Sequence, residues 1–232
     1  MRGSTRALVG LMAVLGAFAA QARPGERRGG SLRPYADPAA VIAADIAFNQ
    51  LAQAKGQWTA FRETAARDAM MFVPQRVDAR DWLKRQADPP VSMRWQPHEV
   101  WMSCDGSYAV TRNAWWKPDS TGFLLTVWQR QEKDRGYRWL LQVGDTLAQP
   151  LAAPEMIAGK IAECAGRPVR RPPPPTSAPP APAPLDPAHG QADDGTLRWN
   201  ADLDAKGAGS VRVERWTGAA YEEVLRAPIT GG

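Results

Sequence analysis

The sequence has few of the residues that build covalent or metal-based frameworks. Its 232 residues include two cysteines and two histidines. Two cysteines exclude a disulfide-dense scaffold and an all-cysteine zinc site, and two histidines disfavour a histidine-rich metal centre. We therefore expect neither a bound metal ion nor a cofactor. Tyrosine is also scarce, with four residues, whereas tryptophan is abundant, with ten.

Long apolar runs are lacking as well. Residues 7–20 are apolar, but these 14 residues fall short of the run of about 20 that crosses a bilayer. The run follows Arg2 and Arg6 and precedes the small residues of Ala20-Gln21-Ala22, which is the pattern of a cleaved secretory signal. We expect a signal peptide at residues 1–22, no membrane span after its removal, and an exported protein, periplasmic or secreted.

The net charge of +5 does not describe the folded part of the chain. The signal segment and residues 23–36, a flexible basic segment, carry the excess of arginine. Residues 37–166 hold 15 basic and 15 acidic residues, and residues 167–232 hold eight of each. A uniform basic face is therefore not expected, and nucleic acid is not an expected partner.

Proline divides the remaining chain. Residues 167–190 contain the runs 172–175 and 179–184, in which every residue is proline or alanine. Proline lacks an amide proton and fixes φ, so this segment is expected to be an extended linker. It separates a first domain at residues 37–166 from a small β extension at residues 191–232, for which three strands are expected from residue 197 onward.

The first domain begins with helical patterns and continues with strands. Asp37-Pro38 predicts the start of a helix that ends at Gly56, and a second short helix carries Trp58 and Phe61. Asp78, with Asp81 three residues later, resembles a capping arrangement and predicts the start of a third helix. From residue 91 apolar residues alternate along four expected strands, which Pro97 interrupts with a bend or bulge. A closing helix is expected from Pro154 onward. Helices followed by an antiparallel meander predict an α+β fold with helices packed on one curved sheet.

Several segments resemble a known family. They are FNQLAQAKGQWTAFRETAARDAMMFVPQ, then DWLKRQADPP, then VTRNAWWKPDSTGFLLTVWQRQEKDRGYRWLLQVGD, of which the TVWQRQ and GYRWLLQVGD parts are the most specific. Over about residues 38–148 the chain resembles the nuclear-transport-factor-2-like (NTF2-like) superfamily, and within it exported SnoaL-like domains. The resemblance implies a cone-shaped α+β fold with a pocket between helices and sheet. The family includes ketosteroid isomerases, polyketide cyclases, dehydratases and binding domains without catalysis, so the fold alone does not give the function.

The catalytic set of such an isomerase is incomplete here. Its enolate chemistry needs an aspartate base together with a tyrosine and a protonated carboxyl as donors. Tyr108 is the tyrosine on a core strand, and Gln142 stands where the family pattern has an acidic residue. An amide cannot act as a general base. His98 and Asp145 remain as candidate bases, against the alternatives of a structurally satisfied histidine and a turn-capping aspartate.

A ligand pocket is the next expectation. Arg112 can neutralise an anionic ligand or form a cross-strand ion pair. Most tryptophans are expected to be core residues, but with so many we expect one or more to line a cavity for a flat apolar ligand. The expected pocket residues are Trp58, Phe61, Trp82, Tyr108, Arg112, Trp128 and Gln142.

The two cysteines suggest a covalent link. Cys104 lies at an expected strand end and Cys164 on the expected closing helix. In an oxidising compartment we expect them to form a disulfide, against the alternative of two buried free thiols.

Three functions stay open. The first is an exported small-molecule-binding domain whose partner is an apolar small molecule; the second is an enzyme of isomerase, cyclase or dehydratase type; the third is a structural or interaction module. The extension can dock on the first domain, pair with a partner chain or be marginally stable, and a homodimer is one arrangement considered.

Overall fold

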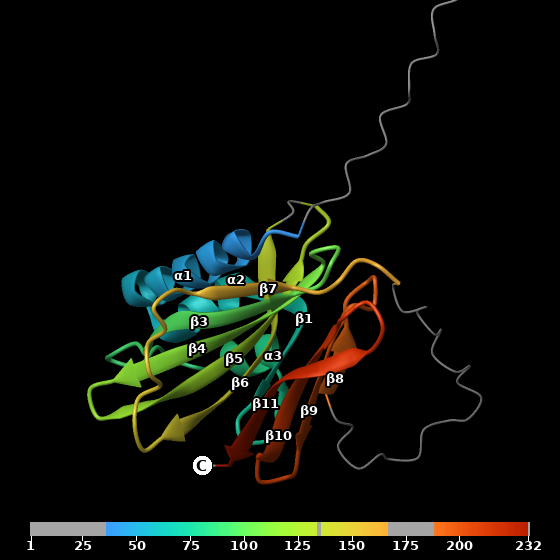
Figure 1. Ribbon diagram of the computed structural model, residues 1–232. Helices are drawn as coiled ribbons and strands as arrows, with labels where there is room; N and C mark the ends of the chain where they lie inside the picture. Colours follow the sequence, from blue (N-terminus) through green and yellow to red (C-terminus); the bar gives the residue numbers. More distant parts are fainter. Residues whose placement is uncertain (1–35, 134–135, 167–187, 232) are drawn as a thin grey trace, which may run out of the picture. The chain divides into compact units, whose positions relative to one another are not determined.

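The computed structural model describes residues 36–133, 136–166 and 188–231 (Figure 1). The expected signal peptide, nearly all of the basic segment at 23–36 and most of the linker at 167–190 lie outside these ranges. None of the helices in the described ranges combines the length and apolar character needed to cross a bilayer.

The first helix, α1 (Pro38–Lys55), forms as its ends predict. The Asp37 carboxylate accepts a hydrogen bond from the backbone N–H of Ala39 at 3.0 Å, and Pro38 occupies the first turn. The helix ends at Gly56, whose φ of +105° favours glycine.

The second helix, α2 (Gln57–Thr64), is capped from a distant loop. Gly56 at its start has no side chain, and the carboxylate of Asp88 accepts hydrogen bonds from the backbone N–H groups of Trp58 and Thr59 instead. The Thr59 hydroxyl donates to the same carboxylate at 2.6 Å. A Cβ at Gly56 would lie 2.3 Å from the Asp88 Cγ, so glycine leaves room for this cap.

A short hairpin and a third helix follow. Strand β1 (Ala65–Phe72) pairs antiparallel with β2 (Arg76–Asp78), and α3 (Ala79–Leu83) begins where Asp78 accepts a hydrogen bond from the Asp81 backbone N–H at 2.8 Å. The Asp78–Asp81 spacing predicted this start.

The central meander is antiparallel, as predicted. It consists of β3 (Arg94–Met102), β4 (Tyr108–Lys117), β5 (Ser120–Arg130) and β6 (Tyr137–Leu147). The register of β3 against β4 shifts between Pro97 and Glu99, at the position where proline predicted an irregularity. The α+β fold class is confirmed: helices α1 and α2 accompany a curved sheet (Figure 1).

Two parallel strand pairs make this seven-stranded sheet mixed, in the order β2-β1-β6-β5-β4-β3-β7. Strand β1 pairs parallel with β6, and β7 (Ala158–Ile161) pairs parallel with β3. The closing helix expected from Pro154 onward is therefore wrong. Residues 158–161 instead satisfy the backbone groups of β3 from Glu99 to Met102, which would otherwise form an open sheet edge.

The predicted disulfide is present. Cys104 and Cys164 are joined with an S–S distance of 2.03 Å and a Cα–Cα distance of 5.3 Å. The bond connects the end of β3 to the residues that follow β7. It thereby fixes the edge strand to its neighbour.

The C-terminal extension forms a second sheet of four antiparallel strands. They are β8 (Ala188–Gln191), β9 (Leu197–Leu203), β10 (Ala208–Trp216) and β11 (Tyr221–Thr230), in the order β11-β10-β9-β8. The sequence predicts three strands and a linker that reaches residue 190; residues 188–190 of β8 lie within that linker. Its signal is weak because four residues with a glycine and a histidine show no clear alternation.

Hydrogen bonds join the extension to the larger sheet. The backbone N–H of Cys104 donates to the Thr196 hydroxyl at 2.9 Å, and the backbone N–H of Asp105 donates to the Asp194 carboxylate at 2.9 Å. Buried apolar residues of both sheets belong to one hydrophobic core. Of the three alternatives for the extension, the structure therefore has it docked.

Candidate functional site

An aromatic cluster fills the space between helices α1 and α2 and the sheet. The rings of Phe48 and Trp95 meet edge to face at 4.7 Å, and those of Phe48 and Phe61 at 4.8 Å. Trp128 and Trp139 join the same cluster, and each is at most 1% exposed. Most tryptophans of the first domain are thus core residues, as expected.

The residues expected to line one pocket are divided between the two faces of the sheet. Phe61, Trp128 and Gln142 are buried on the side of the helices. Trp58 and Trp82 are half-buried and pack edge to face at 5.2 Å. Tyr108 and Arg112 lie on the opposite face from Thr111, because side chains alternate along β4 and Thr111 contacts α1.

Each polar member of that set already has a partner or is enclosed. The Tyr108 hydroxyl accepts a hydrogen bond from Gln129 at 2.8 Å, and Arg112 forms an ion pair with Glu99 at 3.4 Å. Gln142 is 2% exposed. The seven residues therefore do not line one common cavity.

A buried carboxyl, Asp45 of α1, lies at the centre of the interior. It is fully buried; its Oδ1 accepts a hydrogen bond from the Trp95 indole at 2.8 Å and its Oδ2 accepts one from the Thr111 hydroxyl at 2.7 Å. Desolvation raises the pKa of Asp45 to about 6, and the hydrogen bonds from Thr111 and Trp95 oppose that rise.

Polar side chains continue from Asp45 across the sheet. Thr111, Thr126 and Gln142 are direct neighbours on β4, β5 and β6, so their side chains share the face toward the helices. The Thr126 hydroxyl and both amide atoms of Gln142 are buried and have no hydrogen-bond partner among the described residues. This polar row is unusual in an otherwise apolar interior.

Sequence reasoning missed Asp45, although a signal existed. Val41, Asp45, Phe48 and Ala52 follow the spacing i, i+4, i+7 and i+11, which places all four on one face of a helix. An aspartate at such a position is bound to be enclosed with the apolar residues.

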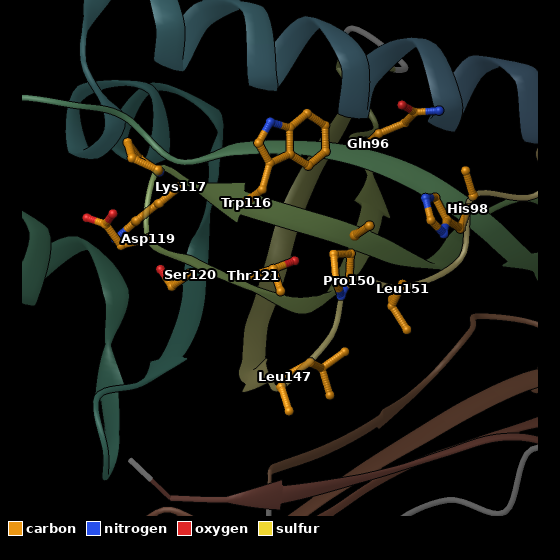
Figure 2. A pocket seen from close by; sticks show the side chains of 14 residues that line it. Gln96, His98, Trp116, Lys117, Asp119, Ser120, Thr121, Leu147, Pro150 and Leu151 are labelled. Atoms are coloured by element: carbon orange, nitrogen blue, oxygen red, sulfur yellow. The ribbon is translucent and has the colours of Figure 1, made fainter.

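An open cavity lies beside the first half of β3 and the C-terminal end of β4 (Figure 2). It has a volume of about 520 Å³. Its walls come from β3 and β4, the turn between β4 and β5, and the segment that follows β6 (Figure 2). Apolar groups include Ala114, Trp116, Leu147 and Leu151, and Trp116 is 41% exposed.

The same cavity holds His98. The residue lies at the bulge of β3 and its side chain lies on the cavity wall (Figure 2). Burial lowers the pKa of His98, the Arg112 charge lowers it further, and Glu99 opposes the change. The imidazole is therefore neutral at pH 7, and no hydrogen bond joins it to another of the described residues. A neutral imidazole can accept or donate a hydrogen bond to a ligand.

Polar groups also line this cavity. Gln96, Asp119, Ser120 and Thr121 belong to its lining. A mainly apolar wall with a few polar groups is the usual composition of a small-molecule site. Of the sequence-predicted site residues, His98 belongs to this cavity.

Asp145 lies elsewhere. It lines a separate cavity of about 340 Å³ together with Val73, Pro74 and Ile229. Its Oδ2 accepts hydrogen bonds from the backbone N–H and the hydroxyl of Thr230, at 2.6 and 2.7 Å. Partial burial opposes these bonds, but together they lower the pKa of Asp145. Asp145 is therefore an ionised carboxylate that holds the end of β11 through Thr230, and it lines a different cavity from His98.

No group of three or more histidine, cysteine, aspartate and glutamate side chains within the described ranges is arranged to hold a metal ion.

Comparison with known proteins gives structural likenesses. No family model and no curated protein matches the sequence. An NTF2-like protein of unknown function from Shewanella baltica OS155 is similar to 48% of this chain over 94% of its own, with 12% identity and a TM-score of 0.37. A proposed ketosteroid isomerase from Kribbella flavida DSM 17836 is similar to 64% of this chain over 94% of its own, with 15% identity and a TM-score of 0.33. At these values, the chemistry of the site rests on this chain's own residues.

Proposed function

We propose that this chain is an exported small-molecule-binding protein of NTF2-like type, and that its ligand occupies the cavity of Trp116 and His98. The observation that carries this proposal is that the exposed indole of Trp116 and a neutral imidazole, that of His98, line the same open cavity of about 520 Å³. The ligand is a flat, largely apolar molecule with one hydrogen-bonding group.

The chemistry of the cavity supports this ligand class. An exposed tryptophan ring offers a large apolar face, and covering it with a ligand removes that surface from water. Leu147 and Leu151 provide further apolar wall, while His98 and Gln96 offer hydrogen bonds that orient a polar group. The interior cluster around Phe48 does not serve this purpose, because its rings already contact one another.

A fluorescence titration tests this site. Uncharged naphthalene and steroid compounds are added to the mature protein, and quenching or a shift of tryptophan emission reports binding. Trp116→Ala is expected to weaken binding at least about tenfold, since it removes the main apolar contact. Met156→Ala is the matched control, because Met156 is 77% exposed and does not line the cavity. Saturable binding that both variants retain would contradict the proposed site.

Export is supported by the signal pattern at residues 1–22 and by the disulfide between Cys104 and Cys164, since disulfides persist in oxidising compartments. N-terminal sequencing of exported material is expected to begin at Arg23. A sequence that begins at Met1 would contradict the cleavage.

An enzyme of isomerase, cyclase or dehydratase type is the second candidate, and Asp45 favours it. A buried carboxyl with a pKa of about 6 is suited to general acid–base chemistry near neutral pH. However, a base must reach its substrate, and both Asp45 oxygens accept hydrogen bonds inside a closed cluster. The expected result is that Asp45→Asn leaves ligand binding at Trp116 unchanged. A ketosteroid isomerisation that the wild type catalyses and Asp45→Asn abolishes would establish the enzyme instead.

A further inference from the structure

A third cavity is lined mainly by arginine. It has a volume of about 580 Å³, and Arg62, Arg67, Arg80 and Arg138 contribute to its walls. These side chains come from four separate elements, α2, β1, α3 and β6. The cavity thus collects four positive charges from four separate elements, and Arg138 lies 58 residues beyond Arg80.

Few negative charges offset them. Glu63 is the acidic residue of the lining, and its carboxylate forms an ion pair with Lys55 at 3.1 Å. Within the described ranges no carboxylate forms an ion pair with any of the four arginines. The first domain is neutral in sum, so this excess of positive charge is local.

Two of the arginines are held in place by neutral groups. The Arg62 guanidinium donates to the backbone carbonyls of Leu83 and Gln86, at 2.8 and 3.2 Å, and to the Thr59 hydroxyl at 2.8 Å. Arg138 donates to the backbone carbonyl of Glu63 at 2.7 Å. The atoms that contact the two guanidinium groups are neutral carbonyl and hydroxyl oxygens. The Thr59 hydroxyl bond and, to a smaller extent, the Arg62 charge lower the pKa of Asp88, so this carboxylate offsets part of the Arg62 charge. The rest of the positive charge remains available to a ligand.

We propose that this cavity binds a small molecule carrying two or more phosphate or carboxylate groups. Guanidinium groups present paired N–H donors that match the two oxygens of such an anion, which a point-charge lysine does not. A volume of about 580 Å³ is in the range of small-molecule sites and exceeds the size of one inorganic oxyanion. Arg67 and Arg80 supply the free donors, and Arg62 and Arg138 supply fixed charge.

The site is independent of the proposed Trp116 cavity, since the two linings have no residue in common. One ligand does not have to fill both cavities, so the anionic ligand proposed here needs no apolar ring. Failure at one site leaves the other proposal standing.

Isothermal titration calorimetry tests the proposal. The mature protein is titrated with inorganic pyrophosphate and with citrate, each at low salt and at about 0.3 M sodium chloride, which screens exposed charges. One saturable site is expected for at least one of the two anions, weakened by salt. The phosphate probe and the carboxylate probe decide which oxyanion the site prefers.

Substitutions locate the site. Arg67→Gln and Arg80→Gln are each expected to weaken binding about tenfold, because each removes a charge-assisted pair of hydrogen bonds. Both side chains are exposed, so the fold is expected to persist, which the melting temperature checks. Arg94→Gln is the matched control, since Arg94 is exposed and does not line the cavity. Any of three results would overturn the proposal. They are the absence of saturable binding of either anion, an equal weakening of binding by Arg94→Gln, and binding of an oligonucleotide in preference to both anions.

Discussion

Thr111 donates its hydroxyl proton to Asp45 across the space between β4 and α1, at 2.7 Å. The direction of this bond follows from its neighbours: the Thr111 oxygen already accepts N–H groups from the Trp128 indole at 3.1 Å and from Asn113 at 3.2 Å. A hydroxyl has one proton, so Asp45 receives it. The network therefore suits the ionised carboxylate, while the surrounding burial favours the neutral acid.

This competition predicts a pH-dependent stability. The pKa of folded Asp45 is about 6, above its ordinary 3.8, so the folded protein binds this proton more tightly than the unfolded chain. The resulting stabilisation is complete below about pH 4 and is lost as the pH rises through about 6. It amounts to at most ~3 kcal/mol.

Asp45→Asn lacks this proton equilibrium. The free energy of unfolding of the wild type, minus that of the variant, should therefore fall as the pH rises from about 4 to about 7, a range that spans both pKa values. Denaturant unfolding at several pH values measures it. A difference that stays constant over this range would show that Asp45 does not titrate as described.

The same substitution, threonine to valine, should affect the free energy of unfolding differently on two adjacent strands. Thr111→Val removes one donor and one acceptor that three buried groups share, and it should cost about 3 kcal/mol of the free energy of unfolding. Thr126→Val removes a buried hydroxyl that has no partner among the described residues, so it should be neutral or stabilising. Urea unfolding compares them, and similar losses in both would refute the assignment of Thr111 as the centre of the network.

The distant cap of α2 gives a third prediction. Asp88→Ala should cost about 1 kcal/mol, since it leaves the Trp58 and Thr59 backbone N–H groups without their acceptor. The Thr59 hydroxyl bond lowers the pKa of Asp88, so this contribution is present at neutral pH and is lost as the pH falls through the folded-state pKa. Thermal unfolding at pH 7 and in acid measures both effects. An equal cost of Asp88→Ala at both would count against the cap.

The disulfide gives a fourth. Replacing Cys104 and Cys164 together with alanine should lower the free energy of unfolding by about 4 kcal/mol, because the bond closes a loop with a sequence separation of 60. Thiol titration of the denatured, unreduced wild type should find no free thiol, and two after reduction. Two thiols before reduction would disprove the bond.

Local signals predicted most of the elements of the first domain. Asp37-Pro38, Asp78–Asp81 and Pro97 each act through the backbone nearby, and the structure has a helix start or a strand irregularity at all three. The helix predicted from Pro154 onward was wrong, because residues of this segment pair with β3, which is distant in the sequence. The open edge of β3 pairs with residues 158–161, and no local pattern reports a vacant edge.

The candidate site was less accessible to sequence reasoning. His98 was proposed as a candidate from its residue type, but the cavity that it lines depends on the segment after β6, which also contributes to the lining. The arginine cavity was missed because its four cations belong to four elements and form no run. The contact of Asp145 with Thr230 was not predicted, because Thr230 lies 85 residues away and beyond the proline-rich segment.

The position of the disulfide also determines how the protein responds to a protease. Strands β4, β5, β6 and β7 all lie within the covalent loop closed by Cys104 and Cys164. A single nick in the turn at Pro118-Asp119 would leave two fragments that remain one covalent molecule. They would separate on a denaturing gel after reduction and migrate together without it.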